Sequence, residues 1–100
     1  MPIYKLQKAT QKGKRYSVVN PDGKRINFGA EGGSTFIDHK DEVKKLNWIA
    51  RHSKMGENWT YSGRDTAGFW ARYLLWSANN LPDAIKYIKK RFGIEVVMSK

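Results

Sequence analysis

The segment Thr66–Leu81 limits the possible folds more than any other part of the chain. It reads TAGFWARYLLWSANNL and carries a single charged residue, Arg72, although the chain of 100 residues has a formal net charge of +10. A stretch this apolar and aromatic must supply the hydrophobic core of so small a protein. The large side chains that it contributes are Phe69, Trp70, Tyr73, Leu74, Leu75 and Trp76. We therefore expect the basic residues to project from a scaffold built around this segment.

The N-terminal part of the chain has the pattern of strands. Tyr4 and Leu6 alternate with polar neighbours, as in a half-buried edge strand. Further on, two apolar runs flank the sequence Asn20–Lys24 (NPDGK). In this sequence Pro21 presets the φ angle of a tight turn, and Gly23 can adopt the left-handed conformation that closes it. These features predict a β-hairpin across Asn20–Lys24.

Beyond Gly33 the apolar residues change to a helical period, and we expect helices near residues 38–54, 65–77 and 82–92. Asp38 or Thr35 is the expected cap of the first helix. Its apolar stripe is predicted to face the core and consists of Val43, Leu46, Ile49 and Ala50.

The second and third helices have clearer boundaries. Ser62–Asp65 approximates a capping box, and the second helix is apolar nearly all round, as expected of a buried central element. Gly68 lowers the helix propensity of this segment, so we expect another element to approach it closely. The third helix has Pro82 in its first turn and a natural stop at Gly93.

Strands followed by helices predict the α+β class. We expect a small antiparallel sheet, made of N-terminal hairpins, packed on a three-helix C-terminal part. A chain of this length forms one domain, residues 1–100. Within it, residues 1–30 form strands and hairpins, residues 38–92 form the helical part, and residues 94–100 form a tail or a short strand.

The residues show no motif of catalysis or metal binding. The sequence has no Cys, which excludes disulfides, thiolate chemistry and Cys-based zinc sites. His39 and His52 lie on one predicted helix, about 220° apart around its axis, so they cannot form a metal-binding pair. The glycines near residue 30 do not form a phosphate-binding loop. We therefore expect a non-enzymatic protein with no catalytic residue, no metal and no cofactor, and no small-molecule substrate is evident.

The excess of basic residues is the remaining signal. Lys and Arg number 19 against nine Asp and Glu, and the isoelectric point is near 10.0. This balance favours a polyanionic partner, namely nucleic acid, an anionic membrane or an acidic protein surface, although the same charge can serve solubility alone. The candidate binding residues are Lys12, Lys14, Arg15, Lys24 and Arg25 near the strands, and Lys86, Lys89, Lys90 and Arg91 on the third helix.

Aromatic residues accompany these basic clusters. Trp59 and Tyr61 lie in the loop between the first and second helices, where a large aromatic side chain either fills the core or anchors a partner. We take both as candidate interface anchors. Together with Tyr4 and Tyr16 they can also provide surface for stacking on bases, although the apolar neighbours of Tyr16 favour a place in the core.

The sequence contains no sign of export or of membrane insertion. The N-terminal residues MPIYKLQKAT lack the apolar run of a signal peptide, so we expect no secretion. No apolar run approaches the roughly 18 residues needed to span a bilayer. The absence of Cys fits a reducing, intracellular setting.

Several motifs carry a resemblance to a known family. They are RYSVVNPDGKRINFGAEG from Arg15, HKDE from His39, ARH from Ala50, ENW from Glu57 and SGRDTAGFWARYLLW from Ser62. In this order they resemble small basic proteins of unknown function encoded by large double-stranded DNA viruses of algae and protists. The likeness extends from Arg15 to about Phe92, and the first dozen residues depart from it. It implies a viral context, with localisation in the virion or the host cell interior, and it supplies no catalytic residues.

Two functions follow as expectations. The first is a structural virion protein, a minor capsid or cement-like adaptor, whose basic faces and aromatic loop bind capsid subunits or other virion proteins. The alternative is a non-specific nucleic-acid-binding protein that acts on DNA in genome packaging or in the viral factory. An adaptor needs several separate patches, whereas a DNA binder needs one continuous basic stripe along the phosphates.

Overall fold

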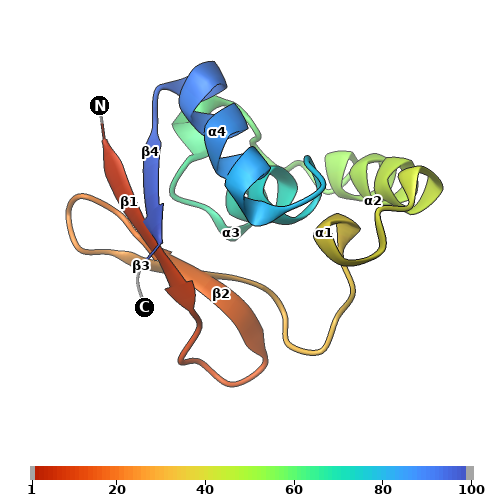
Figure 1. Ribbon diagram of the computed structural model, residues 1–100, viewed down its shortest axis with the longest axis horizontal. Helices are drawn as coiled ribbons and strands as arrows, with labels where there is room; N and C mark the ends of the chain where they lie inside the picture. Colours follow the sequence, from red (N-terminus) through yellow and green to blue (C-terminus); the bar gives the residue numbers. More distant parts are fainter. Residues whose placement is uncertain (1, 99–100) are drawn as a thin grey trace.

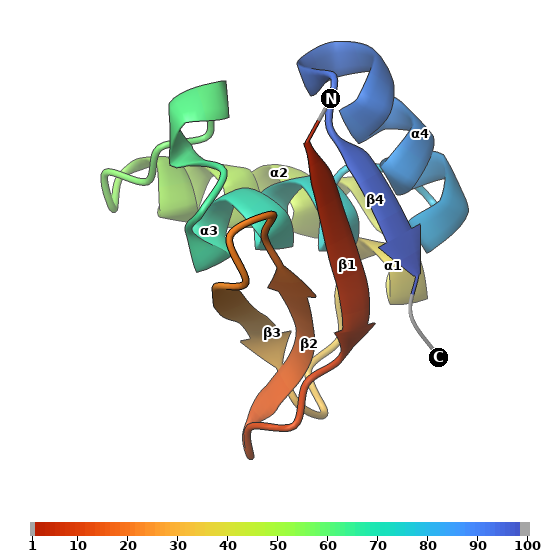
Figure 2. The same ribbon diagram turned by 90° about the vertical axis from the view of Figure 1, so that its left-hand side faces the viewer.

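The computed structural model describes residues 2–98, which form a four-stranded sheet with helices packed on one of its faces (Figures 1 and 2). The strands are β1 (Ile3–Lys8), β2 (Lys14–Val19), β3 (Arg25–Ala30) and β4 (Glu95–Met98), in the spatial order β3-β2-β1-β4. The α+β class is confirmed. The sheet is mixed rather than wholly antiparallel, because β4 pairs with β1 in parallel while the two N-terminal pairings are antiparallel.

The hairpin across Asn20–Lys24 is present as predicted. The side-chain oxygen of Asn20 accepts hydrogen bonds from the backbone N–H groups of Asp22 at 3.0 Å and Lys24 at 2.8 Å. Gly23 has a φ angle of 89°, the left-handed conformation that a side chain would disfavour. The turn therefore sets the register that pairs Val19 with Arg25.

The first predicted helix is instead two helices, α1 (Phe36–His39) and α2 (Glu42–Ser53). Lys40 separates them, because its φ angle of 55° places it in the left-handed region. The side chain of Asp41 then caps α2 by accepting hydrogen bonds from the backbone N–H groups of Val43 and Lys44. Thr35 occupies the N-cap position of α1, where its backbone N–H and hydroxyl groups donate to the Asp38 carboxylate.

The prediction that the aliphatic stripe of α2 faces the core is wrong. Val43 and Leu46 are 66% and 64% exposed and Ala50 is exposed, whereas Trp48 is only 8% exposed and Ile49 is partly buried. The Trp48 ring lies almost parallel to the Trp76 ring, with centroids 5.1 Å apart. A tryptophan buries more apolar area than a valine or a leucine, so Trp48 determines which side of α2 faces the core.

The charge-poor segment forms a buried helix, as predicted. It comprises α3 (Ala67–Trp70) and a π-helical continuation, η2 (Ala71–Leu75). Phe69, Trp70, Leu74 and Leu75 are fully buried. The cap of this helix is Thr66 rather than Ser62–Asp65: its hydroxyl accepts a hydrogen bond from the Phe69 N–H group.

Asp65 bonds to the sheet instead. Its carboxylate accepts hydrogen bonds from the Tyr4 hydroxyl at 2.7 Å and the Asn20 amide at 3.3 Å. The hydrogen bond from Tyr4 lowers the pKa of Asp65, and burial together with this hydrogen bond raises the pKa of Tyr4. The start of α3 is therefore tied to β1 and to the hairpin.

The last helix, α4 (Leu81–Phe92), begins and ends as predicted. Asn80 caps it by accepting from the Asp83 N–H group, Pro82 lies in its first turn, and Gly93 ends it with a φ angle of 67°. The chain then enters β4, so the C-terminal segment is a strand as far as Met98, and Ile94 and Val96 are buried. Residues 99–100 of the predicted tail lie outside the described residues.

Candidate functional site

The structure divides the N-terminal basic cluster between the two ends of the sheet. Lys12 and Lys14 lie at the β1–β2 turn, whereas Lys24 and Arg25 lie at the β2–β3 turn, at the opposite end of β2. Lys5, Val19 and Arg25 are register partners across β1, β2 and β3. The helices leave one face of this sheet open (Figure 2).

The basic residues of α4 form a separate group. Lys86, Lys89 and Lys90 are exposed on this helix, which packs beside β4 (Figure 1). Arg91 is exposed as well, and its guanidinium donates to the Tyr87 hydroxyl at 2.6 Å. The sequence-predicted basic residues are thus distributed over three places rather than one.

Most of this charge has no ionic partner among the residues that the structure describes. Within residues 2–98, Arg15 is the one Lys or Arg that lies within 4.0 Å of a carboxylate. Its guanidinium donates to both oxygens of Asp38, at 2.7 and 2.9 Å, and to the Thr35 hydroxyl. Arg15 therefore holds α1 against β2, and the positive charge available for a partner comes from the other basic residues.

The aromatic candidates are placed differently from one another. Trp59 is partly buried, with its ring parallel to that of Trp48 at 5.9 Å, and its carbonyl accepts a hydrogen bond from the Tyr73 hydroxyl. Tyr61 is 37% exposed and lies beneath the Arg64 guanidinium. Tyr4 is buried, so it offers no ring face for base stacking, whereas Tyr16 is partly buried and stacks on Phe28 with centroids 6.1 Å apart.

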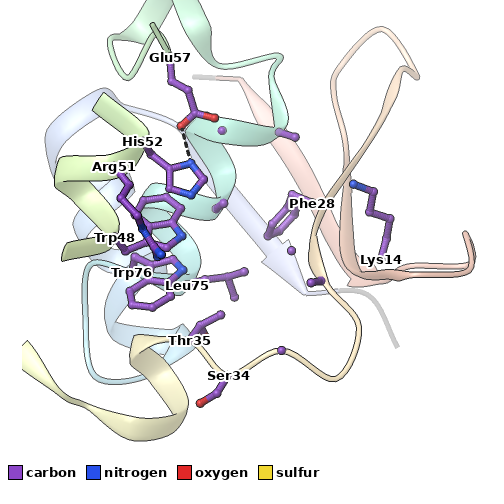
Figure 3. Close-up of a pocket in the computed structure, with 16 residues that line it drawn as sticks. Lys14, Phe28, Ser34, Thr35, Trp48, Arg51, His52, Glu57, Leu75 and Trp76 are labelled. Atoms are coloured by element: carbon purple, nitrogen blue, oxygen red, sulfur yellow. Dashed lines mark ion pairs between the residues drawn. The ribbon is translucent and has the colours of Figure 1, made fainter. Parts of the chain in front are cut away.

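A cleft of about 480 Å³ opens between the end of β3 and α2 (Figure 3). Trp48, His52 and Arg51 line it from α2, Phe28 lines it from β3, and α3 with η2 forms its base. The complete lining consists of Lys14, Phe28, Gly29, Ala30, Gly33, Ser34, Thr35, Trp48, Arg51, His52, Glu57, Ala67, Gly68, Ala71, Leu75 and Trp76.

Small residues make up much of the lining of this cleft. Six of the lining residues are glycine or alanine: Gly29, Ala30, Gly33, Ala67, Gly68 and Ala71. The expected close approach at Gly68 is confirmed, since a Cβ atom there would lie 2.5 Å from the Glu57 carboxylate. A Cβ atom at Gly29 or Gly33 would likewise lie 3.0 or 3.2 Å from its nearest neighbour, so these glycines allow close packing of the walls of the cleft.

One end of the cleft holds a histidine and a carboxylate. His52 Nδ1 lies 3.5 Å from Glu57 Oε2, and the imidazole stacks on the Trp48 ring with centroids 4.0 Å apart (Figure 3). Both atoms are buried, and neither has a hydrogen-bond partner among residues 2–98. The carboxylate therefore favours the tautomer that carries its proton on Nδ1, which leaves Nε2 for contact with a ligand.

Sequence reasoning missed this arrangement. It placed His39 and His52 on one helix, whereas they lie on α1 and α2 and contact the rings of Trp76 and Trp48 respectively. Arg51 and Glu57 were not identified, because Glu57 reaches His52 only after the loop turns back over α2. The motifs ARH and ENW, which contain these three residues, were the available signal.

The structure places no three metal-binding side chains together within residues 2–98. It also has, in the same residues, no helix that is long and apolar enough to cross a membrane.

Comparison with known proteins gives one similarity. Residues 4–52 match a family of unknown function, DUF5754. The match begins in β1 and ends at His52 in α2, so it includes the hairpin and the α2 wall of the cleft. Neither a curated protein nor a solved structure matches the chain.

Proposed function

We propose that this protein is a non-enzymatic adaptor that binds acidic, partly apolar surfaces of larger proteins. The resemblance to proteins of large DNA viruses suggests that these partners are capsid subunits or other virion proteins. The observation that carries the proposal is the outward face of α2, where the exposed side chains of Val43, Leu46 and Ala50 form an apolar ridge.

Basic residues border this ridge. At the helical period Lys44 and Arg51 lie along one side of it, and Lys54 lies at its C-terminal end. Within residues 2–98 none of the three has a carboxylate within 4.0 Å. An amphipathic segment with an apolar stripe and an acidic flank complements this face in both shape and charge. A second copy of this chain does not, because two proteins of net charge +10 repel each other.

The distribution of charge favours an adaptor over a DNA-binding protein. The sheet end at Lys24, the opposite end at Lys12 and the exposed side of α4 are separate patches, as bridging between subunits requires. DNA has no use for an exposed aliphatic ridge, and of the aromatic residues considered for base stacking Tyr4 is buried and Trp59 is stacked on Trp48. In this proposal Trp59 packs against Trp48 and is not an interface anchor. The ridge of α2 makes the apolar contact with the partner that the sequence predicted for Trp59 and Tyr61.

The test uses particles purified on a density gradient from the virus that encodes the chain. We expect mass spectrometry to find the protein at a defined stoichiometry. A photoreactive phenylalanine analogue in place of Leu46 should cross-link to an acidic segment of a larger virion protein. The variant Leu46→Asp should abolish incorporation while the protein remains folded, whereas Lys89→Ala should have little effect, because an exposed ion pair contributes only about 0–1 kcal/mol.

Other results would contradict the adaptor. Abundance in infected cells with absence from particles would exclude a structural virion protein. Cross-links to nucleic acid would support the alternative instead, especially with an affinity for duplex DNA that falls with salt by about 0.9 logarithmic units per phosphate contacted. Cross-links to lipid would identify the ridge as a membrane contact.

A further inference from the structure

We propose that the cleft between β3 and α2 binds a small organic anion, a carboxylate or a phosphate monoester attached to a flat apolar body. This inference goes beyond the adaptor function, because the adaptor surface is the outward ridge of α2 and the cleft lies toward the sheet. No part of the adaptor proposal requires a ligand in it.

The size and lining of the cleft suit such a molecule. Its volume of about 480 Å³ lies within the range of about 300–1,000 Å³ that is typical of small-molecule sites. Phe28, Leu75 and the two tryptophans Trp48 and Trp76 give it an apolar interior. Ala67 and Ala71 add short apolar side chains to the same lining.

The charges at the opening select an anion. Arg51 projects from α2 on one side, and Lys14 projects from β2 on the opposite side (Figure 3). Neither has a carboxylate partner within 4.0 Å among residues 2–98. Two unpaired cations beside a concave apolar surface concentrate positive potential inside it. Ser34, exposed at the same opening, adds a hydroxyl that can donate to an anionic oxygen.

Glu57 is the one carboxylate in the lining, and it does not oppose this selection. Its Oε2 faces His52 Nδ1, and the rest of the carboxylate lies over Gly68. Glu57 therefore acts as a positioning residue for the imidazole. With the proton on Nδ1, Nε2 of His52 is a hydrogen-bond acceptor, so the selection of an anion rests on Arg51 and Lys14.

Binding can be followed by two-dimensional NMR on the full-length protein. The probes are 1-naphthoate and 1-naphthyl phosphate, with 1-naphthalenemethanol as the uncharged control of the same body. We expect the indole signals of Trp48 and Trp76 to shift on titration with the anions. The signal of Trp70, which is buried outside the cleft lining, should stay in place. The two anions identify whether carboxylate or phosphate is preferred, and both should bind at least about tenfold more tightly than the alcohol.

Variants separate the cleft from the surface lysines. Arg51→Ala and Lys14→Ala should each weaken anion binding by about fivefold, as the loss of one partly exposed charge contact predicts, and should leave binding of the alcohol unchanged. Lys54→Ala and Lys89→Ala are matched controls outside the lining and should have no effect. Ala67→Leu fills the entrance from an exposed helix position, so the protein should stay folded and lose binding of all three probes.

Three results would overturn the inference. The first is an affinity for the alcohol equal to that for the anions. The second is a set of shifts confined to the hairpin turns and α4, which would show adsorption on the basic patches. The third is unchanged binding in a folded Ala67→Leu variant. Arg51 borders the ridge as well as the cleft, so the variants that separate the two proposals are Lys14→Ala and Ala67→Leu, which lie outside α2 and test the cleft alone.

Discussion

Arg15 and Asp38 form an ion pair between parts of the chain that are 23 residues apart. Arg15 therefore contributes to the structure of the protein rather than to the charge available for a partner. The bidentate hydrogen bonds from Arg15 hold the pKa of Asp38 well below its usual range, and the bonds from Thr35 act in the same direction. The same carboxylate accepts from the Thr35 N–H group at 2.8 Å. One side chain thus joins β2, the start of α1 and the loop before it.

This pair predicts a dependence of stability on acid. Because the folded-state pKa of Asp38 is depressed below the ordinary value of 3.8, its contribution to stability is present above that value. This contribution is lost progressively as the pH falls from 3.8 toward the lower folded-state pKa of Asp38. We expect Asp38→Asn to lower the urea midpoint at pH 7 and to show a smaller further loss between pH 5 and pH 3 than the parent protein. Asp22→Asn, at an exposed turn, is the matched control, and equal acid dependence in the parent and Asp38→Asn would contradict the assignment.

At the scale of elements, α2 shows what determines which side of a helix is buried. The aliphatic stripe and the tryptophan lie on opposite sides of the helix, and only one of them can face the core. Trp48 stacks with Trp76, Trp59 and His52, whereas Val43 and Leu46 remain exposed. Lys45 lies on the buried side too, where its ammonium donates to the Ser77 carbonyl.

The two leucines Leu74 and Leu46 test this orientation. Leu74 is fully buried in η2, whereas Leu46 is 64% exposed on α2. We expect Leu74→Ala to lower the free energy of unfolding by about 2–5 kcal/mol, the range for large-to-small changes in a core. Leu46→Ala should change it by no more than about 0.5 kcal/mol, as for other surface substitutions. Equal effects in chemical denaturation would mean that α2 is turned the other way.

At the scale of the whole molecule, β4 returns the chain to its beginning. Ile3 pairs with Glu95 and Leu6 pairs with Met98, so the last described strand completes the sheet beside the first. The radius of gyration of 12.7 Å agrees with the value of about 13 Å for a folded domain of this length. Closure of the sheet therefore depends on contacts between the two ends of the sequence.

Removal of residues 94–100 tests the importance of this closure. The truncation deletes the buried side chains of Ile94 and Val96, each of which contributes about 1.5–3 kcal/mol by burial. That loss is a large part of the roughly 5–15 kcal/mol that stabilises a small domain. We expect β1 amides to lose protection in hydrogen exchange before the β2–β3 hairpin does. Unchanged protection in β1 would show that β4 is dispensable.

The sequence by itself determined the features that local chemistry controls. The hairpin follows from Pro21 and Gly23, in a turn that hydrogen bonds to Asn20 close. The limits of α4 follow from Asn80 and Gly93. The burial of α3 and η2 was also predictable, since a segment with one charge has no other favourable environment. These features depend on residues near one another in the chain, so their patterns are visible without the fold.

Only the tertiary structure decided the remaining features. The break at Lys40, the outward turn of Val43 and Leu46, the parallel pairing of β4 and the meeting of His52 with Glu57 in a cleft each depend on partners from other elements. The Trp48 side of α2 faces the core, rather than the aliphatic side, because the Trp48 ring can stack there on Trp76 and Trp59. A periodic pattern shows that a helix has an apolar side, but the partner that gains most from contact decides which side is buried.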